Sequence, residues 1–455
     1  MIVNRKKLSI ALCLAITTNL ASYTFNQINP SPLPARAVYA SEDTAKQKEL
    51  SKAIDAVAYS YVRSQLADDN PKATPGAQIL VMKDGKVVFE KSYGTIQAFD
   101  FSKEGDNKIV DPIPVKNDTL FDLASVTKIS ATTQVFLHLV YEGKVSLEDK
   151  VTKYLPEFGK NGKEEVTIGQ LLSHTSGLPQ WKAIYLYSDN RQATLEYIEN
   201  QKLEFEPGEY KYSDLGFMTL AFVAEKITGE SFDEYATKTI YDPLNLKHTS
   251  FKPLDHGFNK ENIAVTSFGN PFEQRMIDEV NYPDFGYDMT EDKEAFDQFK
   301  GWRDYELQGE VNDGNTAMAN GGVAGHAGLF STASDLGNLY QVVLDKGKQG
   351  DTVLYDEATL NSFLTDVSKN KNGSIQAYGF LKNASWMKPL SEDAFGHNGF
   401  TGTYVTISPK HNLVVIVLTN KMNNGLQEKG LYNNTHDFAG AVNFAVHNSY
   451  IESDN

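Results

Sequence analysis

The sequence predicts a mixed α/β (α+β) fold in which helices flank one antiparallel sheet and a helical subdomain lies beside it. Strand-like alternation occurs near both ends of the 455-residue chain, at residues 77–82 and 87–93 and again at 403–407 and 413–419. The stretch between them, about 116–325, is rich in helix and loop signals. Strands from distant segments can join in one sheet, so we expect the functional site in the cleft between the two parts.

Individual elements follow from spacing and turn residues. An N-terminal helix is predicted because apolar residues recur at helical spacing, at Leu50, Ile54, Val57 and Tyr61. Asp84-Gly85 separates the first two strand-like runs, which is a strong signal for a β-hairpin. A helix that contains Phe217 and Ile227 is closed by Gly229. We also predict a strand at Tyr378–Phe380 and a final helix at Phe438–His447.

The first 40 residues have the features of an export signal. Arg5, Lys6 and Lys7 precede the apolar run Leu8–Leu14, and Val38-Tyr39-Ala40 offers small residues for cleavage before Ser41. An uncleaved N-terminal anchor is the alternative. We therefore expect a secreted, cell-envelope-associated protein whose hydrolase domain covers 41–455. Its sheet subdomain would comprise about 41–115 and 326–455, and its helical subdomain about 116–325.

Composition excludes several classes of function. Cys13 is the single cysteine and lies in the predicted signal, so a thiol nucleophile and disulfides are excluded for the remaining chain. Residues 1–40 carry four basic and no acidic residues, so the net charge of −16 becomes −20 without them. Such an acidic protein is a poor nucleic-acid binder. The nine histidines show no metal-ligand spacing, and we expect no metal or cofactor.

Ser125 and Lys128 form a Ser-x-x-Lys pattern before an apolar, helix-like stretch that ends near Gly143. Residues three apart share one face of a helix, so the Lys128 amine would lie beside the Ser125 hydroxyl. A basic neighbour is what activates a serine nucleophile. The same spacing occurs at Ser368 and Ser385, but the first lies in a predicted loop and the second has no helix after it.

Two further motifs offer partners for Ser125. Tyr212-Ser213-Asp214 follows a Pro-Gly turn and precedes a helix, whereas the same three residues at Tyr187-Ser188-Asp189 have neither context. We therefore prefer Tyr212 as the group that takes the serine proton. The third motif, Phe395–Thr403, is rich in glycine around His397 and leads into a strand, where a substrate backbone could lie along the strand edge.

The three motifs, in this order, resemble those of the penicillin-recognising serine hydrolases. This family contains the class C β-lactamases, DD-carboxypeptidases and related esterases. The segments 171–179 and 325–336 also resemble parts of that family, and the resemblance runs from about residue 75 to 420. It implies a β-lactamase/transpeptidase-like fold with its active site in a cleft between two subdomains, and it implies an acyl-enzyme mechanism.

The resemblance also implies roles for single residues. Ser125 corresponds to the nucleophile, and Lys128 and Tyr212 to the proton-handling pair, in which a nearby ammonium would favour the tyrosine phenolate. His397 and Gly399 correspond to the strand motif. The N–H groups of Ser125 and Phe400 correspond to the oxyanion donors. His174 and His326 lie in family segments, and we interpret both as structural.

Two positions depart from the family pattern. Asp214 stands where asparagine is typical, and an ionised carboxylate cannot donate a hydrogen bond to a substrate carbonyl. His397 stands where the β-lactamases have lysine, so the cleft loses a positive charge that would hold a β-lactam carboxylate. We expect weak β-lactam hydrolysis at most. Protonation of His397 near pH ~6 would restore part of that charge.

The predicted function is that of an exported serine hydrolase acting on D-amino-acid amides or esters of the cell envelope. Its substrate could be a peptidoglycan stem peptide or a D-alanylated polymer, and a covalent β-lactam adduct is possible. The alternatives are an esterase for small esters and a non-catalytic wall-binding or sensor protein. An α/β-hydrolase is disfavoured because the chain has no Gly-x-Ser-x-Gly elbow.

Overall fold

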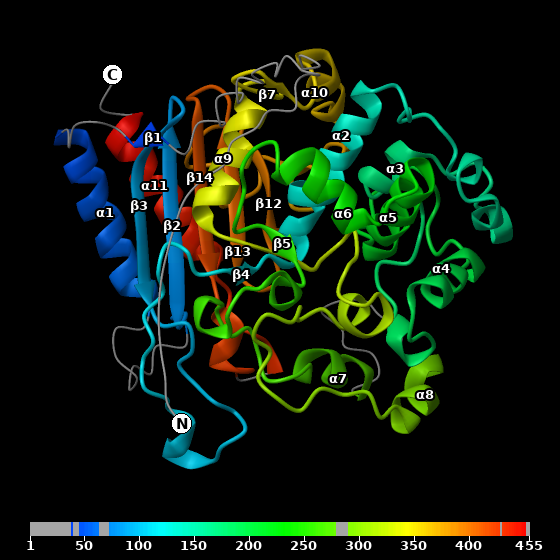
Figure 1. The fold of residues 1–455 in the computed structure, drawn as a ribbon, viewed down its shortest axis with the longest axis horizontal. Coiled ribbons are helices and arrows are strands. Elements are labelled where there is room, and N and C mark those ends of the chain that lie inside the picture. Colours follow the sequence, from blue (N-terminus) through cyan, green and yellow to red (C-terminus); the bar gives the residue numbers. More distant parts are fainter. Residues whose placement is uncertain (1–37, 40–44, 63–71, 279–289, 428–429, 452–455) are drawn as a thin grey trace, which may run out of the picture. The chain divides into compact units, whose positions relative to one another are not determined.

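A large β-sheet assembled from both ends of the chain forms the centre of the fold (Figure 1). The computed structural model describes residues 38–39, 45–62, 72–278, 290–427 and 430–451. Within them the sheet has the order β1 (Val38–Tyr39), β3 (Lys86–Gly94), β2 (Gly76–Lys83), β14 (Leu413–Thr419), β13 (Thr403–Ser408), β12 (Phe395–Gly399), β11 (Leu381–Lys382), β10 (Ile375–Gln376) and β9 (Ser368–Lys369). Neighbouring strands are antiparallel except β1 and β3, which are parallel. The predicted fold class is confirmed.

Shorter strands and the helices complete the described architecture. The short strands are β4 (Phe121–Asp122), β5 (Ser250–Phe251), β6 (Leu329–Ser331), β7 (Lys348–Gln349) and β8 (Thr352–Val353). The helices are α1 (Ala45–Tyr61), α2 (Thr133–Tyr141), α3 (Ile168–Leu172), α4 (Arg191–Asn200), α5 (Asp214–Thr228), α6 (Phe232–Ala236), α7 (Pro271–Asp278), α8 (Lys293–Gln298), α9 (Ala333–Leu344), α10 (Glu357–Phe363) and α11 (His436–Tyr450). None of the described helices is long and apolar enough to cross a membrane.

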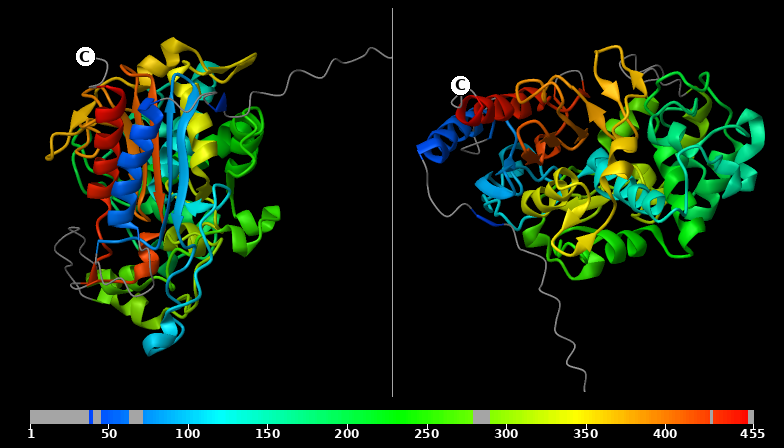
Figure 2. Two further views of the ribbon diagram at one scale, coloured as in Figure 1. Left: turned by 90° about the vertical axis from the view of Figure 1, so that its left-hand side faces the viewer. Right: turned by 90° about the horizontal axis from the view of Figure 1, so that it is seen from above.

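The two faces of the sheet are covered by different helices. α1 and α11 lie side by side on one face, where the rings of Tyr61 and Phe438 stack with centroids 5.2 Å apart (Figure 2). α9 packs on the other face, and the side chain of Leu80 fills the space beside Gly337. Alternate residues of β2 and β14 therefore enter two separate cores, which accounts for their apolar character on both sides.

The hairpin and helix signals of the sequence are confirmed. Asp84 and Gly85 both have positive φ values, 53° and 72°, as the turn between β2 and β3 requires. α5 begins at a side-chain cap, where Ser213 Oγ accepts the Gly216 N–H at 3.2 Å. It ends at Gly229, whose φ of 72° is the left-handed geometry of a glycine cap.

Two local predictions are wrong. Residues 378–380 form a turn instead of a strand, because Gly379 has a φ of 84° and the chain doubles back so that Ala377 N–H donates to Phe380 O at 2.9 Å. Close approach to α2 fixes this turn, since a Cβ at Gly379 would lie 2.0 Å from Thr133 Oγ1. The run at Ser368, predicted as a loop, begins with strand β9, which pairs with β10.

The predicted signal peptide lies outside the described residues except for Val38 and Tyr39, which form β1. It stays a prediction, as do the proposed cleavage before Ser41 and the subdomain boundaries.

Candidate active site

Ser125 lies in a short 3₁₀ turn that several elements hold in place. Ala124, just before it, has a φ of 45°, an uncommon conformation for a residue with a side chain. Asp122 accepts the Ala124 N–H at 2.9 Å and thereby fixes this conformation. From the sheet, Thr403 Oγ1 donates to Leu123 O at 2.9 Å. The turn that presents Ser125 is therefore anchored on both sides.

Lys128 lies one turn further on and is fully buried. Residues Lys128–Thr132 form a π-helical turn that leads into α2, so the predicted helical context is confirmed with an irregular first turn. The Lys128 Nζ donates to Ser125 Oγ at 3.0 Å, to Asp214 Oδ1 at 2.7 Å and to His326 O at 3.1 Å. All three N–H bonds of the ammonium group therefore have partners.

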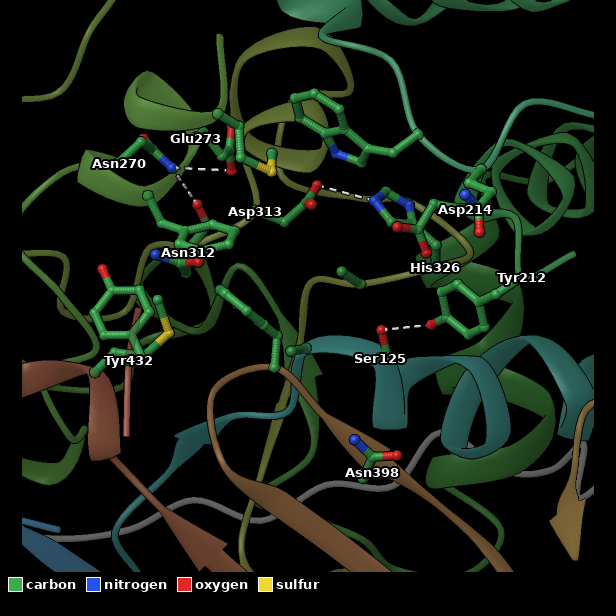
Figure 3. Close-up of a pocket in the computed structure, with 18 of the residues that line it drawn as sticks. Ser125, Tyr212, Asp214, Asn270, Glu273, Asn312, Asp313, His326, Asn398 and Tyr432 are labelled. Carbon is green, nitrogen blue, oxygen red and sulfur yellow. Dashed lines mark hydrogen bonds and ion pairs between the residues drawn. The ribbon is translucent and has the colours of Figure 1, made fainter. Parts of the chain in front are cut away.

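Tyr212 approaches Ser125 from the loop before α5. Its hydroxyl donates to Ser125 Oγ at 2.9 Å (Figure 3). The ring of His174 packs against that of Tyr212 with centroids 4.4 Å apart, and His174 Nδ1 accepts the Ser213 N–H at 3.0 Å. His174 thus positions the loop, in agreement with its structural interpretation. The alternative Tyr187 is 48% exposed and bonds to Asp292.

The electrostatics reverse one expectation. Burial, together with the Asp214 carboxylate, raises the pKa of Tyr212 well above its usual value. The idea that Lys128 would bring Tyr212 towards the phenolate is therefore wrong. Burial lowers the pKa of Lys128, and the charge of Asp214 opposes this shift. Lys128 gives up its proton more easily than a free lysine, whereas Tyr212 keeps its own.

The strand motif lies on β12 itself. His397, Asn398 and Gly399 pair with β13, while β11 pairs with the preceding Phe395 and Gly396. Among the described strands, none pairs with the other edge of these three residues. A Cβ at Gly399 would lie 2.2 Å from Thr403 Oγ1 and 2.3 Å from Leu123 O. Glycine is needed there because β12 passes directly beside the turn that carries Ser125.

His397 lines the cavity but carries no charge in it. The side chain is 5% exposed, and its Nδ1 lies 2.7 Å from Asn398 O. Burial and the nearby Lys128 lower the pKa of His397 to about 3. The expectation that His397 would become protonated near pH ~6 is therefore wrong, since its pKa lies far below the ordinary value of ~6.5.

The cavity above Ser125 has a volume of about 430 Å³ and an acidic, aromatic lining. Asp214, Glu273 and Asp313 contribute carboxyl groups, and none of the lining residues within the described part of the chain is a lysine or arginine. Phe400 forms part of its wall and is 37% exposed. The N–H groups of Ser125 and Phe400 remain predicted oxyanion donors.

Three acidic residues in or beside the cavity were not predicted from the sequence. Asp122 lies three residues before Ser125, but no motif marked it. Glu273 and Asp313 come from segments with no recognisable pattern. Asp313 accepts a hydrogen bond from Thr316 N at 2.7 Å and pairs with His326 Nε2 at 2.9 Å (Figure 3). The backbone carbonyl of His326 also accepts a hydrogen bond from Lys128. The family segment that contains His326 therefore does contact the site, although motifs of side chains could not predict a backbone contact.

The described residues contain no group of three or more His, Cys, Asp or Glu side chains arranged to hold a metal ion. The alternative serines also lie away from the cavity lining. Ser368 is on the outermost described strand of the sheet, and Ser385 lies in an exposed turn. The structure brings together Ser125, Lys128, Tyr212, Asp214 and His397.

Comparison with known proteins places this geometry in a family. The family model described as Beta-lactamase matches residues 63–437. An N-acetylmuramyl-L-alanine amidase of Bacillus subtilis (strain 168) is 35% identical over 76% of this chain and 77% of its own length. A putative D-alanyl-D-alanine carboxypeptidase of Escherichia coli (strain K12) is 33% identical over 76% of this chain and 78% of its own.

Solved structures agree on the fold. A penicillin-binding protein homologue from Caulobacter crescentus has a TM-score of 0.63 at 18% identity, covering 91% of this chain and 99% of that one. A family VIII carboxylesterase has the same TM-score at 19% identity and the same coverage. The chain therefore belongs to the beta-lactamase family of penicillin-recognising enzymes and is a serine hydrolase.

Proposed function

We propose that this protein is an exported serine hydrolase that cleaves an amide or ester bond of a cell-envelope peptide through an acyl-enzyme on Ser125. The observation that carries the proposal is the position of Ser125 Oγ, 3.0 Å from Lys128 Nζ and 2.9 Å from the Tyr212 hydroxyl. A serine between a buried amine and a phenol has both a proton acceptor and a proton donor within reach.

The pKa directions assign the two proton roles. Lys128, whose pKa is lowered by burial, takes the Ser125 proton as its free amine while Oγ bonds to the substrate carbonyl carbon. Tyr212, whose pKa is raised, stays protonated and donates to the leaving nitrogen or oxygen as its bond to the carbonyl breaks. The proton held by Lys128 then restores the Tyr212 hydroxyl. The acyl-enzyme is hydrolysed by the same steps in reverse. Water bonds to the carbonyl carbon while its proton passes through the Tyr212 oxygen to Lys128. Lys128 then returns a proton to Ser125 Oγ as the bond between Oγ and the carbonyl carbon breaks, and the acid is released.

The charge of the cavity favours some substrates over others. Its described lining carries three carboxyl groups and no arginine or lysine, so these residues offer no cation to bind a substrate carboxylate. The Lys421 ammonium lies over the Phe400 ring at 5.8 Å, but Lys421 is not part of the lining. We therefore propose a bond within the envelope peptide, distant from a free carboxyl terminus. The name of the Bacillus subtilis relative, an amidase, supports this choice.

Three other substrates remain as alternatives. A DD-carboxypeptidase reaction is supported by the name of the Escherichia coli relative but places a terminal carboxylate in the acidic cavity. A D-alanyl esterase reaction on an envelope polymer uses the same chemistry without that carboxylate. A small-ester hydrolase is supported by the aromatic part of the lining. A protein that only binds the cell wall would not need the contacts of Ser125 with Lys128 and Tyr212, so these contacts disfavour that role.

A matched substrate set tests the proposal. The purified protein and its Ser125→Ala variant are incubated with N-acetylmuramyl-L-alanyl peptide, a peptide ending in D-Ala-D-Ala, a D-alanyl ester and p-nitrophenyl acetate. We expect turnover of the muramyl amide and the small ester by the unmodified protein only, with kcat/KM for the D-Ala-D-Ala peptide at least ~10-fold lower than for the muramyl amide. Faster turnover of the D-Ala-D-Ala peptide would overturn the proposed substrate, and turnover by Ser125→Ala would overturn the proposed nucleophile.

Export is a separate part of the proposal and rests on residues 1–40. Expression of the full chain in a Gram-positive host, followed by mass analysis of the culture medium and the wall fraction, tests it. A product that begins at Ser41 supports cleavage. Full-length protein that stays in the cytoplasm contradicts export.

A further inference from the structure

Asp122 is a buried acidic residue whose side chain joins two separate backbone segments. It is 3% exposed and lies on β4, which pairs with β6. Its Oδ1 accepts the Ala124 N–H at 2.9 Å, and its Oδ2 accepts the Asn312 N–H at 2.7 Å. An ionised carboxylate only accepts hydrogen bonds, so both of its oxygens suit backbone donors.

The ionised form of Asp122 is the one present at neutral pH. Burial raises the pKa of Asp122 to about 6, and the N–H groups of Asn312 and Ala124 oppose this shift. The pKa is therefore above the usual value of ~3.9 but still below 7. Both contacts are consequently charge-assisted hydrogen bonds, which are stronger than neutral ones.

The contact with Ala124 holds an unfavourable backbone conformation. Ala124 has a φ of 45°, and a residue with a side chain keeps such a conformation only where its surroundings fix it. The next peptide plane carries the Ser125 N–H, so the direction of this N–H depends on the backbone angles of Ala124. The carboxylate of Asp122 therefore controls the direction of one predicted oxyanion donor.

The backbone carbonyl of Asp122 holds the segment that carries the other predicted donor. Thr401 follows Phe400 in the turn between β12 and β13, is 2% exposed, and donates from Oγ1 to Asp122 O at 2.6 Å. The Phe400 N–H is thus one residue away from an anchor on Asp122. The two donors come from distant parts of the chain, and Asp122 contacts a direct neighbour of each.

We propose that Asp122 is the positioning residue of the oxyanion hole and keeps the N–H groups of Ser125 and Phe400 directed at one point. The inference rests on the proposed function, because an oxyanion forms only when Ser125 Oγ bonds to a substrate carbonyl carbon. Asp122 does not line the cavity and acts through Ala124 and Thr401. Donors that are fixed before charge develops stabilise the transition state, so loss of Asp122 should affect rate more than substrate affinity.

Binding of phenylboronic acid tests the inference without requiring turnover. Ser125 Oγ bonds to boron and its proton passes to Lys128. Boron becomes tetrahedral and negatively charged, and one of its oxygens occupies the place of the oxyanion. Dissociation constants are measured by calorimetry, and boron NMR shows whether the adduct is tetrahedral. The samples are the unmodified protein, Asp122→Ala, and the control Asp118→Ala, which removes an exposed carboxylate four residues earlier.

We expect Asp122→Ala to bind phenylboronic acid ~10²-fold more weakly or worse, which is the effect of losing one oxyanion donor. The control should bind it as the unmodified protein does. For hydrolysis of the muramyl amide, kcat should fall by a similar factor while KM stays within about threefold. A folded Asp122→Ala that keeps its affinity for phenylboronic acid would overturn the inference, and so would a loss confined to KM.

Thr401 provides a second test, which decides if Asp122→Ala does not fold. Thr401→Val removes the hydroxyl donor to Asp122 O at nearly constant volume and should weaken the adduct about tenfold, whereas Thr401→Ser keeps the hydroxyl and should bind normally. Equal affinities of these two variants would contradict the inference. Failure of the unmodified protein to form any tetrahedral adduct would instead contradict the proposed function, on which the inference rests.

Discussion

The Asp214 carboxylate lies 2.7 Å from the Lys128 ammonium nitrogen, which in turn contacts Ser125 Oγ at 3.0 Å. Asp214, which stands where the family usually has asparagine, therefore contacts the lysine that lies next to the nucleophile. Burial of Lys128 favours its neutral form, and the ion pair with Asp214 favours its charged form. In the proposed mechanism, Asp214 therefore sets what fraction of Lys128 is neutral and able to act as the base at a given pH.

Replacement of Asp214 by asparagine should shift the pH dependence of the reaction. Removal of the carboxylate lowers the pKa of Lys128, because the interaction that opposed burial is lost. Activity requires the neutral amine and rises with pH through that pKa, so the acidic limb of kcat/KM should move to lower pH. The measurement is p-nitrophenyl acetate hydrolysis between about pH 5 and pH 10.

Asp189→Asn is the matched control, since Asp189 occupies the same position in the alternative Tyr-Ser-Asp sequence and is exposed. Its profile should coincide with that of the unmodified protein. An acidic limb that stays in place or moves to higher pH in Asp214→Asn contradicts the role given to Lys128.

Ser125→Ala should eliminate the covalent intermediate while leaving the fold intact. Ser125 lies in a turn held by Asp122 and Thr403 through backbone groups, so loss of its hydroxyl removes no anchor. Intact-mass analysis after incubation with a fluorescent penicillin checks this outcome, with Ser385→Ala as the control that keeps the adduct. An adduct that persists in Ser125→Ala places the nucleophile elsewhere.

Tyr212→Phe should slow amide hydrolysis much more than hydrolysis of a p-nitrophenyl ester. An amine leaving group needs the proton that Tyr212 donates, whereas p-nitrophenolate leaves without one. Loss of a positioned acid typically costs ~10²–10⁴ in rate, and we expect this range for the muramyl amide. Tyr187→Phe, at an exposed tyrosine bonded to Asp292, should be close to unmodified for both substrates.

An equal loss for amide and ester in Tyr212→Phe would mean that Tyr212 takes the Ser125 proton itself. That outcome would restore the general-base role that the family resemblance had implied and contradict the assignment of Lys128.

The predictable part of the fold is the part with strong local signals. Asp84-Gly85 accepts the two positive φ values of a hairpin turn, and Gly229 closes α5, so the local chemistry alone determines these features. The turn at Gly379 could not be read in the same way. It exists because α2 approaches too closely for a side chain, and contact with a helix so distant in the chain leaves no local pattern.

The candidate site also has a part that the sequence predicts and a part that depends on the tertiary fold. Ser125 and Lys128 are three residues apart, so helical geometry alone predicts their contact. The pKa shifts of Tyr212 and His397 depend on burial, which the spacing of residues in the sequence does not reveal. The predicted phenolate form of Tyr212 and the predicted protonation of His397 near pH ~6 were therefore wrong. Glu273 comes from a different segment and reaches the cavity only through the tertiary fold.

Gly399→Ala should impair catalysis by displacing the Ser125 turn. The new Cβ would lie 2.3 Å from Leu123 O and 2.2 Å from Thr403 Oγ1, so β12 and the turn must separate. Overpacking typically costs ~1–3 kcal/mol of stability, and we expect a lower Tm together with a lower kcat. Gly440→Ala on α11 is the control, because its nearest neighbour would lie 3.8 Å away. Unchanged kcat in Gly399→Ala would contradict the close packing of β12 against the turn.

Hydrolysis of β-lactams should be poor, and its ratio to ester hydrolysis should not depend on the charge of His397 at ordinary pH. The pKa of His397 is lowered to about 3, so the side chain is neutral throughout the range from about pH 5 to pH 8. A β-lactam carboxylate therefore meets no added positive charge as the solution is acidified. We expect the ratio of kcat/KM for nitrocefin to that for p-nitrophenyl acetate to change with pH in the same way in the unmodified protein and in His397→Gln across this range. His397→Lys should raise the ratio by about tenfold, because a charge-assisted hydrogen bond is roughly twice as strong as a neutral one.

His397→Gln keeps a neutral hydrogen-bonding side chain and serves as the control, with a ratio near that of the unmodified protein. A ratio that rises below about pH 7 in the unmodified protein but not in His397→Gln would show that His397 does become charged in the cavity. Nitrocefin turnover well above ester turnover would contradict the view that this acidic cavity disfavours carboxylates.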